Sequence, residues 1–534
     1  MRNAIKYFIV IAIAGMAFSQ ARAADLCGEA VPTLEGPVSG FADPAGPACS
    51  YLGVPYAAPP VGDLRLRAPA PATPRSAVLA ARAFGPSCIQ QETIASGGKS
   101  KSFSEDCLTL NIFRPAKSGT FPVMFWIYGG GYSQGASNYE MYNGARLASE
   151  REVVVVTINY RLGALGFLAL PELAREDPNG SAGNYGLLDT ISALKWVRAN
   201  IAGFGGDSNR VTIFGESAGG VSVCSLLASA PAAGLFHRAI IESGGCDLAQ
   251  SLEKGYAQGR ALAKSFGCDG DDARACLRSK PAAELTKIKV TGFTIAAHID
   301  GYVLADQPIA LIEKGEFNRV PLMVGSNQNE GNLMVAMIPG ALYASRGTVT
   351  KLLQKTIGPR YADIMKMYAF EDYRRPVFLL CAVFVDGFAS RAFAAAEAAG
   401  ARTPTYMYRF NWDEERGGKD LGAFHGLEIS FVFGNLKFKS SPIGLLFGKK
   451  AVKSAEPLSA NMMSYWTNFA KTGDPNGPGL PVWPRYTAET RSRQYLDTVI
   501  STVPIGPQDL ERYRYFASLS IDDLGWGKTP EETK

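Results

Sequence analysis

Histidine is scarce in this chain, which contains three among its 534 residues. Cysteine, histidine and acidic residues nowhere show the spacing of a metal site, so the sequence predicts no metal and no cofactor. Repeats, heptads and long low-complexity tracts are missing as well, which argues against solenoids, coiled coils and disordered tails. The composition is that of a globular protein: 47% of the residues are hydrophobic and 19% are charged, which leaves enough apolar residues for a sizeable core.

Long apolar runs are also lacking, apart from one at the N-terminus. Arg2 and Lys6 introduce an almost wholly apolar run over residues 7–18, and residues 21–23 (Ala-Arg-Ala) suit a signal peptidase. The run is too short to span a membrane, so we expect residues 1–23 to be a signal peptide of an exported, periplasmic or secreted protein. Its removal lowers the formal net charge from +5 to +2, which gives no reason to expect nucleic-acid or membrane binding.

A Gly-Glu-Ser-Ala-Gly motif occupies residues 215–219, between a strand-like run at 210–214 and a helix-like run at 221–227. G-x-S-x-G at such a junction is typical of a nucleophile elbow, where small residues permit a strained, closely packed turn. The turn lifts the Ser217 hydroxyl above the sheet, and the helix N-terminus behind it favours developing negative charge. The motif alone is a weak signal, but its position between strand and helix indicates a serine hydrolase.

An activated serine needs a neighbouring base, most often histidine. The chain order of this kind of site is serine, acid, histidine, which favours His425, in a late glycine-flanked loop. Glu330 is the candidate acid because it follows a buried strand-like run at 321–325, where α/β active sites collect their residues. Taken alone, Glu330 would be a solvated loop carboxylate. His237 leads into a strand and is better explained by packing, and His298 precedes a turn.

A glycine triplet at residues 129–131 follows a mostly apolar run at 122–128. Glycines after a strand let backbone N–H groups turn inward with no Cβ in the way, as in an HGGG-type oxyanion hole with tyrosine in place of histidine. The expected donors are the N–H groups of Gly130, Gly131 and Ala218.

Taken in order, these motifs resemble the type-B carboxylesterase family, which also holds cholinesterases and several secreted lipases. The resemblance runs through residues 52–57, 104–111, 126–131, 184–189, 204–207, 215–220 and 469–476. It implies one α/β-hydrolase domain over 24–534, a large central mostly parallel sheet flanked by helices, with inserted loops forming the active-site gorge. The family's Ser-Glu-His triad corresponds to Ser217, Glu330 and His425. Ser243 matches a serine that the family places beside the triad, although a strand-end cap explains it equally well.

All nine cysteines follow the expected signal peptide, so disulfides are permitted. The family closes a loop over the active-site entrance and a second short loop, which implies two bridges: Cys88–Cys107 and Cys268–Cys276. Proximity in sequence alone suggests a third: Cys27–Cys49. The partners of Cys246 and Cys381 stay open, and Cys224, on the helix after the elbow, is expected to be a buried small apolar residue.

The first disulfide loop bears on the substrate. Cholinesterases carry a tryptophan there as a cation–π platform for choline, and this loop has none, which argues against choline esters. Its Lys99 and Lys101 are solvated charges in the simpler interpretation, and in the sharper one a basic rim that favours anionic esters such as those of polycarboxylic acids. The family's acyl pocket draws on the segment at 291–295, whose small residues suggest an uncrowded pocket. The substrate-binding candidates are Tyr132, Phe293 and His298.

Two other functions stay open beside a small-molecule carboxylesterase. A secreted lipase would need a mobile apolar lid, which the polar and basic first disulfide loop disfavours. Catalytically silent adhesion-type members of the family lose triad residues, whereas this chain keeps all three and the glycines as well. The sequence indicates neither the natural ester nor the oligomeric state.

Overall fold

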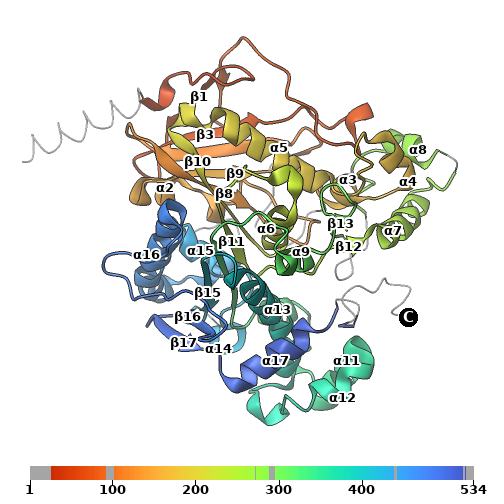
Figure 1. Ribbon diagram of the computed structural model, residues 1–534, viewed down its shortest axis with the longest axis vertical. Helices are drawn as coiled ribbons and strands as arrows, with labels where there is room; N and C mark the ends of the chain where they lie inside the picture. The colour runs from red at the N-terminus through yellow and green to blue at the C-terminus, as the bar shows by residue number, and fades with distance from the viewer. Residues whose placement is uncertain are drawn as a thin grey trace, which may run out of the picture.

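The computed structural model describes residues 26–91, 102–270, 272–287, 295–415, 417–437, 442–520 and 523–524. The expected signal peptide therefore lies outside the described residues, as do Lys99, Lys101 and Phe293. Within the described part, a mixed sheet of eleven strands forms the centre, in the order β17-β16-β15-β14-β11-β10-β8-β9-β7-β3-β2. Helices lie on both sides of it, with α15 and α16 on the left in Figure 1 and α6 and α9 on the right. This is the expected α/β-hydrolase architecture.

The middle of the sheet is parallel. Its strands are β8 (Phe121–Ile127), β9 (Val154–Ile158), β10 (Gly206–Glu216), β11 (Arg238–Glu242), β14 (Leu322–Asn327), β15 (Thr405–Phe410) and β16 (Ser492–Leu496). β8 and β9 are buried along their whole length, because helices cover both faces and select near-continuous apolar runs. Antiparallel strands complete the two edges: β2 (Phe41–Ala42), β3 (Ala48–Pro55), β7 (Thr109–Pro115) and β17 (Ser501–Pro504).

Four long helices pack directly on the parallel strands: α5 (Tyr185–Asn200), α6 (Ala218–Ala228), α13 (Pro376–Gly400) and α16 (Lys449–Thr472). α17 (Pro507–Ala517) packs on α13, and both lie toward the lower end of Figure 1. The other helices lie in the connections: α2 (Ala145–Arg151), α3 (Gly163–Phe167), α4 (Pro171–Glu176), α7 (Leu252–Ser265), α8 (Ala273–Ser279), α9 (Pro308–Lys314), α10 (Asn332–Ala336), α11 (Arg346–Ile357), α12 (Tyr361–Ile364), α14 (Gly418–Leu421) and α15 (Ile429–Val432).

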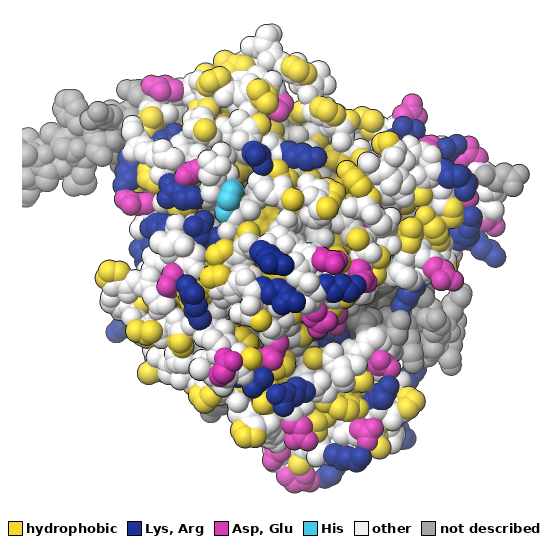
Figure 2. All heavy atoms as spheres, in the orientation of Figure 1, with side chains coloured by type: hydrophobic (Ala, Val, Ile, Leu, Met, Phe, Trp, Pro, Cys, Tyr) yellow, Lys and Arg dark blue, Asp and Glu magenta, His cyan; other side chains and the backbone are white. Residues whose placement is uncertain are grey.

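α13 is, among the described helices, the one long and apolar enough to cross a membrane. Its 25 residues enclose an apolar stretch of which 78% is buried inside the fold, against α17 and strands β14 and β15. Such burial is that of a core helix in a large α/β protein. On the face that Figure 2 shows, positive and negative side chains are interspersed, so no large area of one sign is present there.

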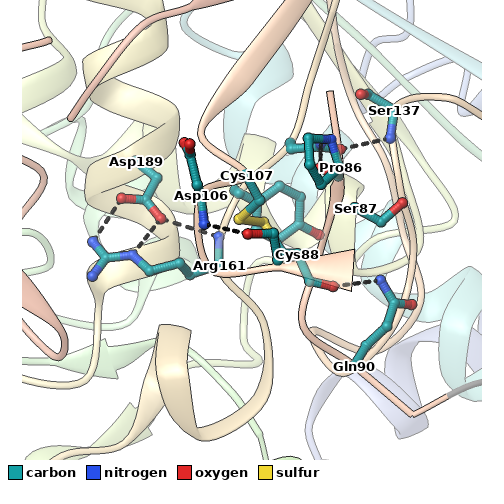
Figure 3. Close-up of a disulfide and its surroundings, with 12 residues drawn as sticks. Pro86, Ser87, Cys88, Gln90, Asp106, Cys107, Ser137, Arg161 and Asp189 are labelled. Atoms are coloured by element: carbon teal, nitrogen blue, oxygen red, sulfur yellow. Dashed lines mark hydrogen bonds and ion pairs between the residues drawn. A yellow bond between two sulfur atoms is a disulfide. The ribbon is translucent and has the colours of Figure 1, made fainter. Parts of the chain in front are cut away.

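Four disulfides are present among the described residues. Three are the expected bridges: Cys27–Cys49, Cys88–Cys107 and Cys268–Cys276. Figure 3 shows the second of them close to the buried ion pair of Arg161 and Asp189, whose atoms lie 2.7 Å apart. The fourth joins Cys224 to Cys246, so Cys224 is not the simple apolar residue that we expected. Cys381 has a free, buried thiol.

Candidate active site

Ser217 forms the whole turn between β10, which ends at Glu216, and α6, which begins at Ala218. Its φ of 56° and ψ of −123° are rare for a residue with a side chain. The turn fits because its glycines lie against β8: a Cβ on Gly219 would be 2.0 Å from the Ile127 carbonyl oxygen. The Ser217 N–H donates to the Glu242 carbonyl at 2.9 Å, which fixes the elbow to β11. The geometry is that of a nucleophile elbow.

Glu330 and His425 meet beyond the carboxyl end of β14. The Nδ1 atom of His425 lies 2.5 Å from Oε2 of Glu330, whose side chain is fully buried. The other carboxylate oxygen accepts hydrogen bonds from the Ser243 hydroxyl at 2.6 Å and from the Asn327 N–H at 2.7 Å. With both oxygens held, Glu330 can fix the tautomer and the orientation of the imidazole. Ser243, Glu330 and His425, which the sequence singled out, thus lie together although they come from segments far apart in the chain.

The second ring nitrogen of His425 faces a residue to which the sequence analysis gave no role. Nε2 lies 3.1 Å from Oε1 of Glu216, the residue immediately before Ser217. His425 therefore has a carboxylate at each nitrogen. The signal was available, since the motif carries an acidic residue beside the serine, but only the fold shows that this side chain turns toward the base.

Glu216 belongs to a cluster of buried carboxyl groups that also includes Glu242 and Glu428. Burial raises the pKa of Glu216 to about 7, with Glu330 adding to the rise and His425 opposing it. Burial likewise raises the pKa of Glu242 to about 8 and that of Glu428 well above its usual range. The polar partners within the cluster are Trp466, whose Nε1 donates to Glu242 at 2.7 Å, and Asn327, which donates to Glu428. Glu242 and Glu428 therefore favour the protonated form at neutral pH, whereas the pKa of Glu216 lies close to it.

The same cluster acts on the base. Burial lowers the pKa of His425, but the carboxylates of Glu216 and Glu330 outweigh it and raise the pKa to about 10. A charged Glu216 therefore favours the imidazolium, which cannot accept a proton. Neutralising Glu216 favours the neutral imidazole that general-base catalysis requires.

We expect Glu216→Gln to move the acid limb of the kcat/KM profile to lower pH. Activity rises with pH as His425 loses its proton, and removing a carboxylate that raises its pKa lets that loss occur earlier. The displacement should be about one to two pH units, the usual effect of a charge at this distance. The profile is measured with a neutral aryl ester.

Glu242→Gln is the matched control, because Glu242 is equally buried but is bonded to Trp466 instead of facing His425. Its acid limb should stay closer to that of the wild type. A Glu216→Gln limb that stayed in place or moved to higher pH would show that Glu216 does not control the base.

The glycine triplet after β8 lies against the nucleophile. A Cβ on Gly129 would be 2.8 Å from the Ser217 Cβ, and Gly130 and Gly131 have φ of 109° and 61°. Among the described residues, no backbone hydrogen bond outside helices and strands takes up the N–H of Gly130 or Gly131. The N–H of Ala218, at the first position of α6, has no partner within its own helix. Three donors are thus available beside Ser217.

Tyr132 follows this triplet and ties it to the helix of the elbow. Its hydroxyl lies 3.1 Å from that of Ser222 on α6, and its ring packs on Phe167 with 4.4 Å between centroids. The side chain is buried, which raises the pKa of the phenol. Tyr132 therefore holds the glycine loop against α6 and Phe167 in this structure.

His298, which the sequence suggested as a substrate-binding residue, lies in the core instead. The ring is buried between glycines: a Cβ on Gly255 would be 2.2 Å from it, and one on Gly183 2.8 Å. Its Nδ1 lies 3.0 Å from the Gly183 carbonyl, and burial lowers the pKa to about 4. His298 is a neutral core residue. His237 packs as expected, its Nδ1 accepting the Val211 N–H at 3.2 Å.

The described residues contain no group of three or more histidine, cysteine or acidic side chains able to hold a metal ion. A strained serine, a histidine paired with a buried glutamate, and backbone donors beside the serine are together the equipment for acyl transfer.

Residues 28–505 match the Carboxylesterase family, and the chain belongs to it. The protein is therefore a carboxylesterase. Fumonisin B1 esterase of Sphingopyxis macrogoltabida is 38% identical over 82% of this chain and 81% of its own length. Para-nitrobenzyl esterase of Bacillus subtilis (strain 168) is 35% identical over 88% and 95%. A solved thermophilic PNB esterase superposes with a TM-score of 0.80 at 33% identity, covering 91% of this chain and 99% of its own.

Proposed function

We propose that this protein hydrolyses carboxylic esters through an acyl-enzyme on Ser217, with His425 as general base and Glu330 as its orienting acid. The observation that carries the proposal is the 2.5 Å contact between Glu330 and His425 Nδ1 beside the strained Ser217 elbow. No other histidine competes for the role, because His298 is enclosed in the core and His237 accepts a backbone N–H.

The reaction has two halves. His425 Nε2 accepts the Ser217 proton as Oγ attacks the ester carbonyl, and the resulting imidazolium is stabilised by Glu330. The oxyanion is bound by the N–H groups of Gly130, Gly131 and Ala218, each donor lowering the barrier by roughly 3–4 kcal/mol. The imidazolium then protonates the departing alcohol. Water, activated by the same histidine, attacks the acyl-enzyme and releases the acid.

Covalent labelling tests this assignment. A fluorophosphonate loses fluoride to an activated serine and forms a stable phosphonate ester, so peptide mapping of the treated protein should place the added mass on Ser217. The labelling should need a neutral His425 and should fall away in His425→Ala. Label on another serine, or full labelling of the histidine variant, would refute the assignment.

We further propose that anionic esters are preferred. Lys99 and Lys101 support this, together with the absence of tryptophan from the first disulfide loop, although both lysines lie outside the described residues. Exposed cations raise the local concentration of an anionic substrate over about a Debye length, ~10 Å at 0.1 M salt. Fumonisin B1, which a relative is named for hydrolysing, belongs in the substrate panel.

Lys99→Glu/Lys101→Glu is expected to lose up to about tenfold in kcat/KM on a carboxylate-bearing ester at low salt. The loss should shrink as salt rises, because screening removes the attraction. A neutral ester of equal size should be little affected. The matched control is Lys449→Glu/Lys450→Glu, the same change in net charge at two exposed lysines at the start of α16. Equal losses on both esters, or in both variants, would return the two lysines to the role of solvated surface charges.

A further inference from the structure

The disulfide that the sequence did not indicate lies next to the catalytic groups. Cys224 is on α6, the helix that begins directly after Ser217, and Cys246 is three residues beyond Ser243. Both are buried, at 0% and 1% exposure. The bridge therefore ties the nucleophile helix to the segment that carries the serine bonded to Glu330.

That segment, residues 243–246, is held in an unfavourable conformation. Ser243 has φ of 49°, which residues with side chains adopt only where the surroundings impose it. Its N–H donates to the Gly325 carbonyl of β14 at 2.9 Å, and its hydroxyl donates to Glu330 at 2.6 Å. The segment thus reaches from β11 to the catalytic acid, and small displacements would lengthen the bond to Glu330.

The other side of the segment lies against α6. A Cβ on Gly244 would be 2.5 Å from the Gly220 carbonyl carbon, so the two backbones are in direct contact. Two residues further along, the disulfide joins Cys246 to Cys224 in the second turn of α6. The Cys246 carbonyl also accepts a hydrogen bond from the Ile309 N–H of α9 at 2.7 Å. The segment is consequently clamped to α6 on one side and presents Ser243 to Glu330 on the other.

We propose that the Cys224–Cys246 disulfide is a positioning device for the catalytic acid. It keeps residues 243–246 seated on α6, so that the Ser243 hydroxyl stays on Oε1 of Glu330 while Oε2 holds His425. The inference rests on the proposed triad. Without the bridge, the Asn327 N–H is left as the constant donor to Oε1, and the carboxylate gains freedom to rotate away from the imidazole.

The chain supplies a matched control. Cys27–Cys49 has the same separation of 22 residues as Cys224–Cys246, so removing either bridge frees the unfolded chain to a similar extent. Cys27 lies at the start of the described chain and Cys49 on β3, next to the edge strand β2 and away from the elements that carry the proposed triad. A difference in catalysis between the two variants therefore reports on position and not on chain entropy.

The experiment compares Cys224→Ala/Cys246→Ala with Cys27→Ala/Cys49→Ala at a temperature where circular dichroism shows both to be folded. Both should melt earlier than the wild type. The first should also lose about tenfold in kcat with little change in KM, the size expected for residues coupled through direct contacts. The second should keep its kcat within about twofold. Equal kcat in the two variants would overturn the proposal.

Ser243→Ala completes a double-mutant cycle. In the wild type and in the Cys27→Ala/Cys49→Ala background it should cost its full effect on kcat, because the clamp is intact. In the Cys224→Ala/Cys246→Ala background the further loss should be small, since the hydroxyl is already displaced. The same loss in all three backgrounds would make the bridge merely structural.

Folding and chemistry are separated by two further measurements. If the alanine pair does not fold, the nearly isosteric Cys224→Ser/Cys246→Ser pair replaces it, and failure of both pairs to fold would assign the bridge a structural role and overturn the proposal. Fluorophosphonate labelling of Ser217 in the wild type reports on the proposed function independently. A wild type that labels elsewhere refutes the triad, whereas normal labelling with an unperturbed bridge variant refutes the positioning role alone.

Discussion

Ser217→Ala should lose roughly 10⁴–10⁶-fold in kcat while the protein stays folded, because the alanine removes the nucleophile and leaves the oxyanion donors in place. His425→Ala should lose a similar amount, and the double variant little more, since residues of a triad act as a unit. The side chain of Ser217 makes no large packing contribution at the turn, so thermal unfolding should be nearly unchanged. The measurements are steady-state kinetics on an aryl ester and a melting curve for each variant.

Two further substitutions discriminate between this assignment and its rivals. Glu330→Gln should cost less than either of the others, because Glu330 orients and stabilises without accepting the proton. His298→Ala should leave the chemistry largely intact and act on stability, since its ring fills the space between Gly183 and Gly255. If His425→Ala kept most activity and His298→Ala lost it, the base would have been assigned to the wrong histidine.

The elbow at Ser217 agrees with the sequence prediction because its signal is local, and the contact between Glu330 and His425 agrees with the chain order of the motifs. A motif between a strand-like and a helix-like run specifies the turn at Ser217, and a chain with three histidines leaves little choice of base. The fold followed from the ordered motifs of the family, and the Cys88–Cys107 and Cys268–Cys276 bridges followed from the same resemblance.

What escaped the sequence depends on which segments the fold brings together. Cys224 and Cys246 pair because α6 runs past the segment after β11, and a buried cysteine is indistinguishable in sequence from a small apolar residue. The carboxyl cluster forms because parallel strands end at one edge, where Glu216 and Glu242 are partners in register on β10 and β11. His298 was misjudged because the glycines that enclose it are distant in the chain.

The cluster also changes how the base should be described. With Glu330 at Nδ1 and Glu216 at Nε2, His425 lies between two carboxyl groups, and burial raises the pKa of the one facing Nε2 to about 7. When Glu216 is protonated, its charge no longer favours the imidazolium form of His425. We therefore expect the acid limb of the pH profile to depend on Glu216, a residue of the elbow motif itself, as well as on His425.

Gly130→Ala should lose about 10²–10³-fold in kcat/KM, the effect of losing an oxyanion donor. At its φ of 109° a residue with a side chain is strained, and the added Cβ would lie 2.2 Å from the Gln134 carbonyl oxygen. That oxygen is backbone and cannot yield without the loop, so the N–H groups behind Ser217 must shift. Steady-state kinetics on a neutral aryl ester measures the loss.

Gly131→Ala is the matched comparison, one residue further along the same loop. Its φ of 61° lies in the left-handed region that residues with side chains tolerate at modest cost, and the nearest atom to the added Cβ is the Ser133 hydroxyl at 3.9 Å. The backbone can stay in place, so the loss should be below about tenfold, the equivalent of about 1.4 kcal/mol. Equal losses in the two variants would mean that the clash with the Gln134 carbonyl, and the shift of the loop that it forces, does not decide the rate. The Cβ added at Gly130 clashes with a backbone carbonyl, and the Cβ added at Gly131 does not. The two variants therefore compare a loop whose N–H groups are displaced with one whose N–H groups stay in place.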